Sequence, residues 1–146
     1  MIHPGRDPER RATSVLAWVL GIVLLVTGTN HFLSPSGFEA IVPRALGSPA
    51  FWVAASGVAE LLVGLGLIVR RTRRLAAIAA VVLFVVVFPA NLKMALDSGD
   101  GTPGWTHIPW VAWARLPLQI PLIAWAAWIA VTTSSAVWKV RRRSSV

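Results

Sequence analysis

The chain has 146 residues, of which 55% are hydrophobic and only 14% charged, and its mean hydropathy is +0.66. Soluble domains carry about a quarter charged residues, so this composition excludes an ordinary soluble protein and predicts an integral membrane protein. A net charge of +8 can indicate nucleic-acid binding. Most Lys and Arg residues here flank apolar runs, where membrane topology explains them, so we expect no nucleic-acid partner. With no cysteine, disulfides, thiolate metal sites and thiol redox chemistry are excluded.

Four apolar runs, each of about twenty residues, are long enough to cross a hydrocarbon core about 30 Å thick. They predict spans at 14–32, 50–69, 75–94 and 110–132. The remaining pieces are a polar segment at 1–13 and a basic tail at 133–146. The sequence therefore predicts an all-α membrane protein, a four-transmembrane-helix bundle at 14–132 surrounded by the lipid bilayer.

Each of the first two spans has a face of small residues that also carries one ionisable side chain. In the first span, Gly21 and Gly28 share this face with His31. In the second, Glu60 lies between two glycines, three residues before it and four after it. Because glycines let helices approach closely, these faces are expected to meet neighbouring helices. A carboxylate at this depth costs at least about 2.5–3.5 kcal/mol, so Glu60 should face protein or trapped water and have a partner.

The connection between these spans, residues 33–49, is too polar to cross a membrane and too apolar for an ordinary loop. We expect a short interfacial helix there. Ser36 and Glu39 have the spacing of a capping box that would start it, and Pro43 would end it.

Prolines near polar residues mark the third and fourth spans. Pro89 precedes Asn91, and because proline frees a backbone carbonyl one turn earlier, we expect a kink there. In the fourth span, Arg115 and Gln119 share one face, and prolines at 117 and 121 predict an irregular backbone. Irregular backbone is tolerated at membrane depth only inside protein or beside a wet cavity, which indicates a pocket.

Charge counting predicts the topology. Eleven of the fourteen basic residues lie in the N-terminal segment, the Arg70 to Arg74 connection and the C-terminal tail, which share one side if there are four spans. Because basic residues favour the cytoplasmic side, we expect both termini in the cytoplasm and residues 97–109 outside.

With that topology the polar residues inside the spans converge on the outer half of the bundle. They are His31, Glu60, Asn91, Arg115 and Gln119. Glu60 and Arg115 lie about 15 Å and 7 Å below the starts of their spans, a gap their side chains could close as an ion pair. Two interpretations stay open: a buried ion pair that only fixes helix register, or a ligand pocket lined by the same residues. A metal site is not expected, since one carboxylate and one histidine are too few ligands.

Several short motifs together resemble one family. They are Gly28-Thr-Asn-His31-Phe32 with Pro35, Phe38 and Pro43; Ser56-Gly57-Val-Ala-Glu60 with Gly64 and Leu67; the arginine turn; Phe88-Pro89-Ala90-Asn91; and Arg115-Leu-Pro117-Leu-Gln119. The chain is similar, from about Val15 to Trp128, to the DoxX-like family of small four-helix membrane proteins of the bacterial cytoplasmic (inner) membrane. The family is named after a subunit of a thiosulfate:quinone oxidoreductase, and most members have no assigned activity. Distant relatives include quinone-handling thiol enzymes, whose cysteines are absent here.

Two classes of function follow. The first is binding of a small amphipathic or quinone-like molecule in the outer-half pocket, as part of a redox system. The second is a non-catalytic accessory or assembly subunit, whose partner is another membrane protein or a second copy of the chain. Whether a reaction is catalysed stays open, and no cofactor other than a quinone is indicated.

Overall fold

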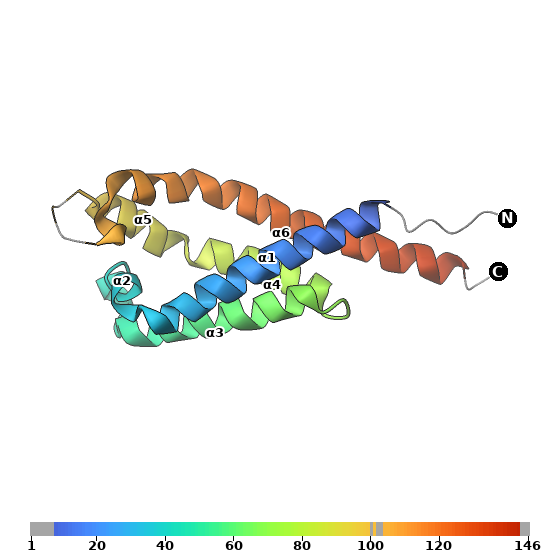
Figure 1. Ribbon diagram of the computed structural model, residues 1–146, viewed down its shortest axis with the longest axis horizontal. Coiled ribbons are helices and arrows are strands. Elements are labelled where there is room, and N and C mark those ends of the chain that lie inside the picture. The colour runs from blue at the N-terminus through green and yellow to red at the C-terminus, as the bar shows by residue number, and fades with distance from the viewer. Residues whose placement is uncertain (1–7, 100, 102–103, 144–146) are drawn as a thin grey trace.

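The computed structural model describes residues 8–99, 101 and 104–143, which form helices and turns with no strand among them (Figure 1). Four stretches are long and apolar enough to cross a membrane. They are α1 (Pro8–Leu33), α3 (Pro49–Ile68), α4 (Arg73–Val86) with α5 (Phe88–Asp97), and α6 (Pro109–Arg143). The chain is therefore an all-α, multi-pass membrane protein built as a four-helix bundle.

The first and last helices, α1 and α6, extend beyond the membrane spans predicted at 14–32 and 110–132. α1 begins at Pro8 and α6 continues to Arg143, so helix extends into both the polar N-terminal segment and the basic tail. Figure 1 shows the start of α1, the end of α6 and the turn between α3 and α4 at the same end of the bundle. We call this the basic end, after the arginines of that turn. The opposite end, which holds the short helices α2 (Pro35–Glu39), η1 (Arg44–Leu46) and η2 (Trp105–His107), is the loop end.

Glycines bring α1 and α3 into close contact along their length. A Cβ atom added to Gly64 would lie 2.8 Å from the carbonyl oxygen of Gly21, and one added to Gly28 would lie 3.0 Å from that of Gly57. Such distances leave no room for a side chain, so the backbones themselves touch. This confirms that each glycine face meets a neighbouring helix, and it shows that the two faces meet each other.

The basic end has an apolar core to which every span contributes. Its buried residues are Ala17, Leu20, Leu24, Leu67, Ala76, Ala77, Ala80, Phe84, Ala126 and Ile129. Many are alanines, which let α4 pack closely on both α3 and α6. Direct packing between the spans therefore holds this end together.

One arginine of the α3–α4 turn is buried and caps a helix. Arg73 donates hydrogen bonds from Nε to the Leu67 carbonyl oxygen at 2.8 Å and from Nη2 to that of Ile68 at 3.2 Å. Its Nη1 also donates to Ser14 Oγ on α1 at 3.0 Å. These carbonyls belong to the last turn of α3 and have no partner within the helix. Nothing in the run of four arginines distinguishes Arg73 from its exposed neighbours.

The third span is broken where the sequence predicted a kink. α4 ends at Val86, and α5 begins at Phe88 with Pro89 in its first turn. The predicted irregularity of the fourth span is wrong, because α6 is one continuous helix through Pro117 and Pro121. Both proline rings are exposed on the bundle surface, so neither disturbs the packing against α4 and α5.

At the loop end, a connecting segment separates the α1–α3 pair from the α5–α6 pair. The capping box expected at Ser36 does not form; α2 begins one residue earlier, with Pro35 at its first position. The segment contacts both pairs: Ile41 packs with Met94, Ala95 and Ala112, and Lys93 Nζ donates to the Ala40 carbonyl oxygen at 2.9 Å. The two pairs are thus joined through this segment and not helix to helix.

Candidate functional site

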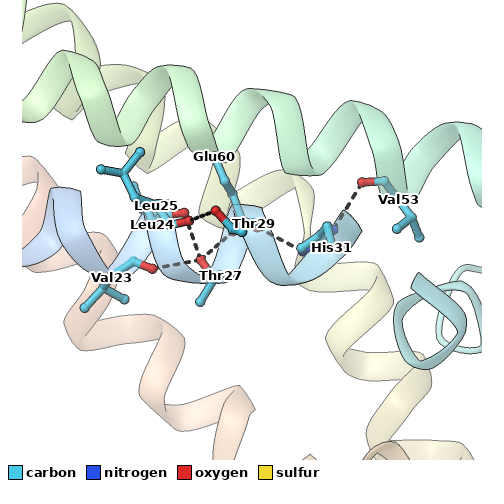
Figure 2. A network of polar contacts seen from close by, with 8 residues as sticks. All are labelled: Val23, Leu24, Leu25, Thr27, Thr29, His31, Val53 and Glu60. Carbon is cyan, nitrogen blue, oxygen red and sulfur yellow. Dashed lines mark hydrogen bonds and ion pairs between the residues drawn. The ribbon is translucent and has the colours of Figure 1, made fainter. Parts of the chain in front are cut away.

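The buried acid of α3 pairs with the histidine of α1. Glu60 Oε1 lies 3.3 Å from His31 Nε2, and each residue is only 9% exposed (Figure 2). Figure 2 shows the Glu60 side chain reaching from α3 onto α1. The glycine contacts explain this pairing, since they hold the two helices so close that a side chain of one reaches the other.

The second ring nitrogen of His31 fixes how many protons the pair carries. Nδ1 lies 3.1 Å from the Val53 carbonyl oxygen, which can only accept, so Nδ1 carries a hydrogen and donates it. Two lone pairs facing each other would repel, so one proton also lies between Nε2 and Glu60 Oε1, on one atom or the other. In either form the pair is neutral overall, which suits a site at membrane depth.

The other carboxyl oxygen of Glu60 is held by a hydroxyl group. Thr27 Oγ1 lies 2.5 Å from Glu60 Oε2 and donates to it, while also lying within 3.2 Å of the Leu24 carbonyl oxygen (Figure 2). Thr27 is four residues before His31, so both lie on the face of α1 that meets α3. Sequence reasoning missed Thr27, although this spacing from His31 could have indicated it.

The ion pair expected between Glu60 and Arg115 does not form. Glu60 pairs with His31 instead, and its carboxylate attracts the Arg115 guanidinium only through space. Two features account for this: the glycine faces place His31 beside Glu60, whereas α6 packs on α4 and α5 and not on α3. Arg115 lies over the indole ring of Trp105 instead, with its Cζ atom 4.8 Å from the ring centroid.

Two aromatic rings, those of Phe38 and Trp105, lie between the acid–base pair and the arginine. His31 stacks on Phe38 with centroids 4.0 Å apart, and Phe38 meets Trp105 edge to face at 5.3 Å. Trp105 in turn carries Arg115. This aromatic ladder, His31–Phe38–Trp105, thus links the α1–α3 pair to α6. The sequence suggested the end members of this arrangement but not the two middle rings.

Asn91 and Gln119 form a separate pair across α5 and α6. Asn91 Nδ2 donates to Gln119 Oε1 at 3.3 Å, and Gln119 Nε2 donates to the Phe84 carbonyl oxygen. Phe84 lies in the last turn of α4, next to the break before Pro89, where carbonyl oxygens lack helical partners. Gln119 is 5% exposed and seals this break. The five residues grouped from the sequence therefore form two paired sets and one cation.

A metal centre finds no support in this geometry. Among the residues that the structure describes, no three His, Asp or Glu side chains gather closely enough to hold an ion. The chemistry available is that of one shared proton, one amide pair and one guanidinium.

These features define the class of protein: a multi-pass membrane protein with a close-packed end and a polar end. At the polar end an acid–base pair lies near an arginine that forms no ion pair with any described acid. The chain belongs to the family described as Domain of unknown function (DUF8561), whose model matches residues 20–130. That range contains all five of the residues discussed. Searches of curated proteins and of solved structures found no match.

Proposed function

We propose that this chain is a DoxX-like protein that binds a small amphipathic or quinone-like molecule at the loop end, with Arg115 as its anchor. The observation that carries the proposal is the state of Arg115. No described residue accepts a hydrogen bond from its guanidinium or forms an ion pair with it, although the residue lies within a membrane span. A charged side chain in that position normally marks a ligand or ion site.

The other polar groups would support such a site without themselves being occupied by it. Glu60 and His31 are satisfied by each other, and Asn91 and Gln119 by each other and the backbone. The first pair links α1 to α3 and the second links α5 to α6, on either side of the connecting segment. In a redox role, the proton shared by Glu60 and His31 is the one that a quinone-like molecule would exchange.

The alternative function is that of an accessory subunit for another membrane protein or a second copy of the chain. The pairing of Glu60 with His31 and of Asn91 with Gln119 favours this function, because a purely structural cluster would have its polar groups paired with one another. Arg115 would then meet an acidic group on the partner.

The proposed location follows from the charges. We place the basic end in the cytoplasm and the loop end outside, in the inner membrane of a bacterium, because Arg70, Arg71 and Arg74 are exposed at the basic end. A reporter fused after residue 146 should be active only as a cytoplasmic reporter, and an external signal would reverse this orientation.

Thermal melting of the purified chain in neutral detergent tests the binding proposal. Decylubiquinone or an extract of native lipids should raise the melting temperature of the wild type and not of Arg115→Gln. Arg44→Gln is the matched control, since Arg44 is exposed at the same end of the molecule and should leave the shift intact. If neither addition shifts the wild type, the accessory function is favoured.

A further inference from the structure

Among the described residues of the spans at the loop end, every ionisable side chain except Arg115 forms an ion pair. Glu60 and His31 share one proton and are neutral as a pair, and Lys93 is paired with Asp97 at 2.6 Å. The Arg115 guanidinium, which keeps its charge at all ordinary pH values, therefore has no ion-pair partner among the described residues.

The guanidinium is positioned by an aromatic ring, and none of its N–H groups donates to a described residue. Its Cζ atom lies over the Trp105 indole, and that ring packs directly on α2, where a Cβ atom added to Gly37 would be 2.9 Å from Trp105 Nε1. The contact with the ring leaves the N–H groups of the guanidinium available to a ligand. A planar fork of this kind matches the two oxygens of a carboxylate or phosphate.

Arg115 also lies below the start of its helix. Six residues separate it from Pro109, the first residue of α6, which corresponds to a depth of about 9 Å. Leu118, three residues on and therefore on the adjoining face of the same helix, is exposed and apolar. A molecule whose head reaches Arg115 would therefore have its remaining atoms in hydrocarbon.

We infer that the ligand of Arg115 is an amphipathic acid, a molecule with an oxyanion head on an acyl chain, and not a neutral amphiphile. The inference rests on the binding function proposed above and narrows its ligand class. A neutral carbonyl compound would accept hydrogen bonds from the guanidinium but would leave it without a counter-charge. An oxyanion accepts the hydrogen bonds and supplies the counter-charge, and charge-assisted hydrogen bonds are about twice as strong as neutral ones. The head is the carboxylate of a free fatty acid or the phosphate of a lipid, which share this chemistry.

The test is a titration of the full-length chain in neutral detergent, followed by thermal melting, with five probes: oleate, oleoyl lysophosphatidate, oleyl alcohol, decylubiquinone and inorganic phosphate. We expect oleate, lysophosphatidate or both to raise the melting temperature, and oleyl alcohol and inorganic phosphate to have no effect. The more effective acid identifies the source of the head.

In Arg115→Gln the apparent affinity should fall by about tenfold or more, as for loss of charge-assisted hydrogen bonds. Arg44→Gln should bind as the wild type does.

Trp105→Leu provides a second variant that keeps the charge. Loss of the ring should weaken acid binding by about two- to thirtyfold, the range expected when a cation–π contact is removed. Equal shifts in the wild type and in Arg115→Gln would overturn the inference, as would a shift by inorganic phosphate alone. A shift by decylubiquinone but by neither acid would overturn it while leaving the proposed binding function standing. No shift by any probe would overturn both.

Discussion

The two ends of this bundle are built in different ways from the same four spans. At the basic end the helices pack directly on one another around alanine and leucine, and the buried Arg73 is satisfied by the end of α3. At the loop end the α1–α3 and α5–α6 pairs are joined through α2, η2 and the aromatic ladder, with a smaller apolar cluster and paired polar side chains. The difference indicates that direct helix packing holds the basic end, whereas the loop end depends on the connecting segment and on its polar pairs.

The largest effect is expected from the acid–base pair. His31→Leu leaves the Glu60 carboxyl buried without its base, so the free energy of unfolding should fall by about 3–5 kcal/mol. Glu60→Gln should cost about 1 kcal/mol or less, because the amide N–H of glutamine can donate to His31 Nε2 in place of the shared proton. Denaturation of both variants in detergent measures the contrast, and equal losses would show that the pair is not the one described.

A smaller loss is expected where α1 and α3 touch nearer the basic end. Gly64→Val forces two methyl groups into a contact where a Cβ alone would lie 2.8 Å from the Gly21 carbonyl oxygen, and should cost about 1–3 kcal/mol. Leu65→Val is the control, since Leu65 is the next residue and is 53% exposed, so its unfolding free energy should change by less than about 0.5 kcal/mol. Similar melting of the two variants would mean that the glycine contact is not tight.

The amide pair of Asn91 and Gln119 should contribute less to the free energy of unfolding than the glycine contact does. Gln119→Leu leaves the Phe84 carbonyl oxygen without its donor, and the loss should fall near the lower end of about 1–3 kcal/mol because an under-satisfied carbonyl is cheaper than an unpaired N–H. Leu118→Val, on the exposed side of α6, serves as control. A loss from Gln119→Leu no greater than that of the control would show that the break between α4 and α5 needs no cap.

The smallest change in stability is expected at the site proposed to bind. Arg115→Gln removes an unpaired charge that makes no hydrogen bond to the described residues, so the unfolding free energy should stay within about 0.5 kcal/mol of the wild type or rise. Melting without added lipid measures this. A loss of several kcal/mol would mean that Arg115 is a structural member of the loop end and would favour the accessory function.

The sequence predicted much of the fold because the signals were local. Apolar runs of the right length located the spans, the glycine spacing predicted which faces of α1 and α3 pack on a neighbouring helix, and Pro89 predicted the break in the third span. The prolines of α6 were misjudged, because the packing of a long helix on its neighbours can offset the local cost of a proline, and proline spacing does not show that packing.

The sequence predicted which polar residues lie inside the spans but not which of them pair with each other. Glu60 and Arg115 were expected at depths from which their side chains could meet, but depth does not show which helices are neighbours. Because α1 packs on α3, Glu60 pairs with His31. Phe38 and Trp105 come from short connecting helices whose positions follow from tertiary packing, so no spacing rule could place them between the two charged groups.

The central claim is that Glu60 pairs with His31 and not with Arg115. A pair of double-mutant cycles on the free energy of unfolding tests it most directly. One cycle combines Glu60→Leu with His31→Leu, and the other combines Glu60→Leu with Arg115→Gln. Contacting partners couple, whereas residues that share no contact add within about 0.5 kcal/mol. We predict a coupling above about 1 kcal/mol for Glu60 with His31 and additivity for Glu60 with Arg115. Additivity in the first cycle together with strong coupling in the second would contradict the account, because Arg115 would then be the partner of Glu60 and no free cation would remain to bind a ligand.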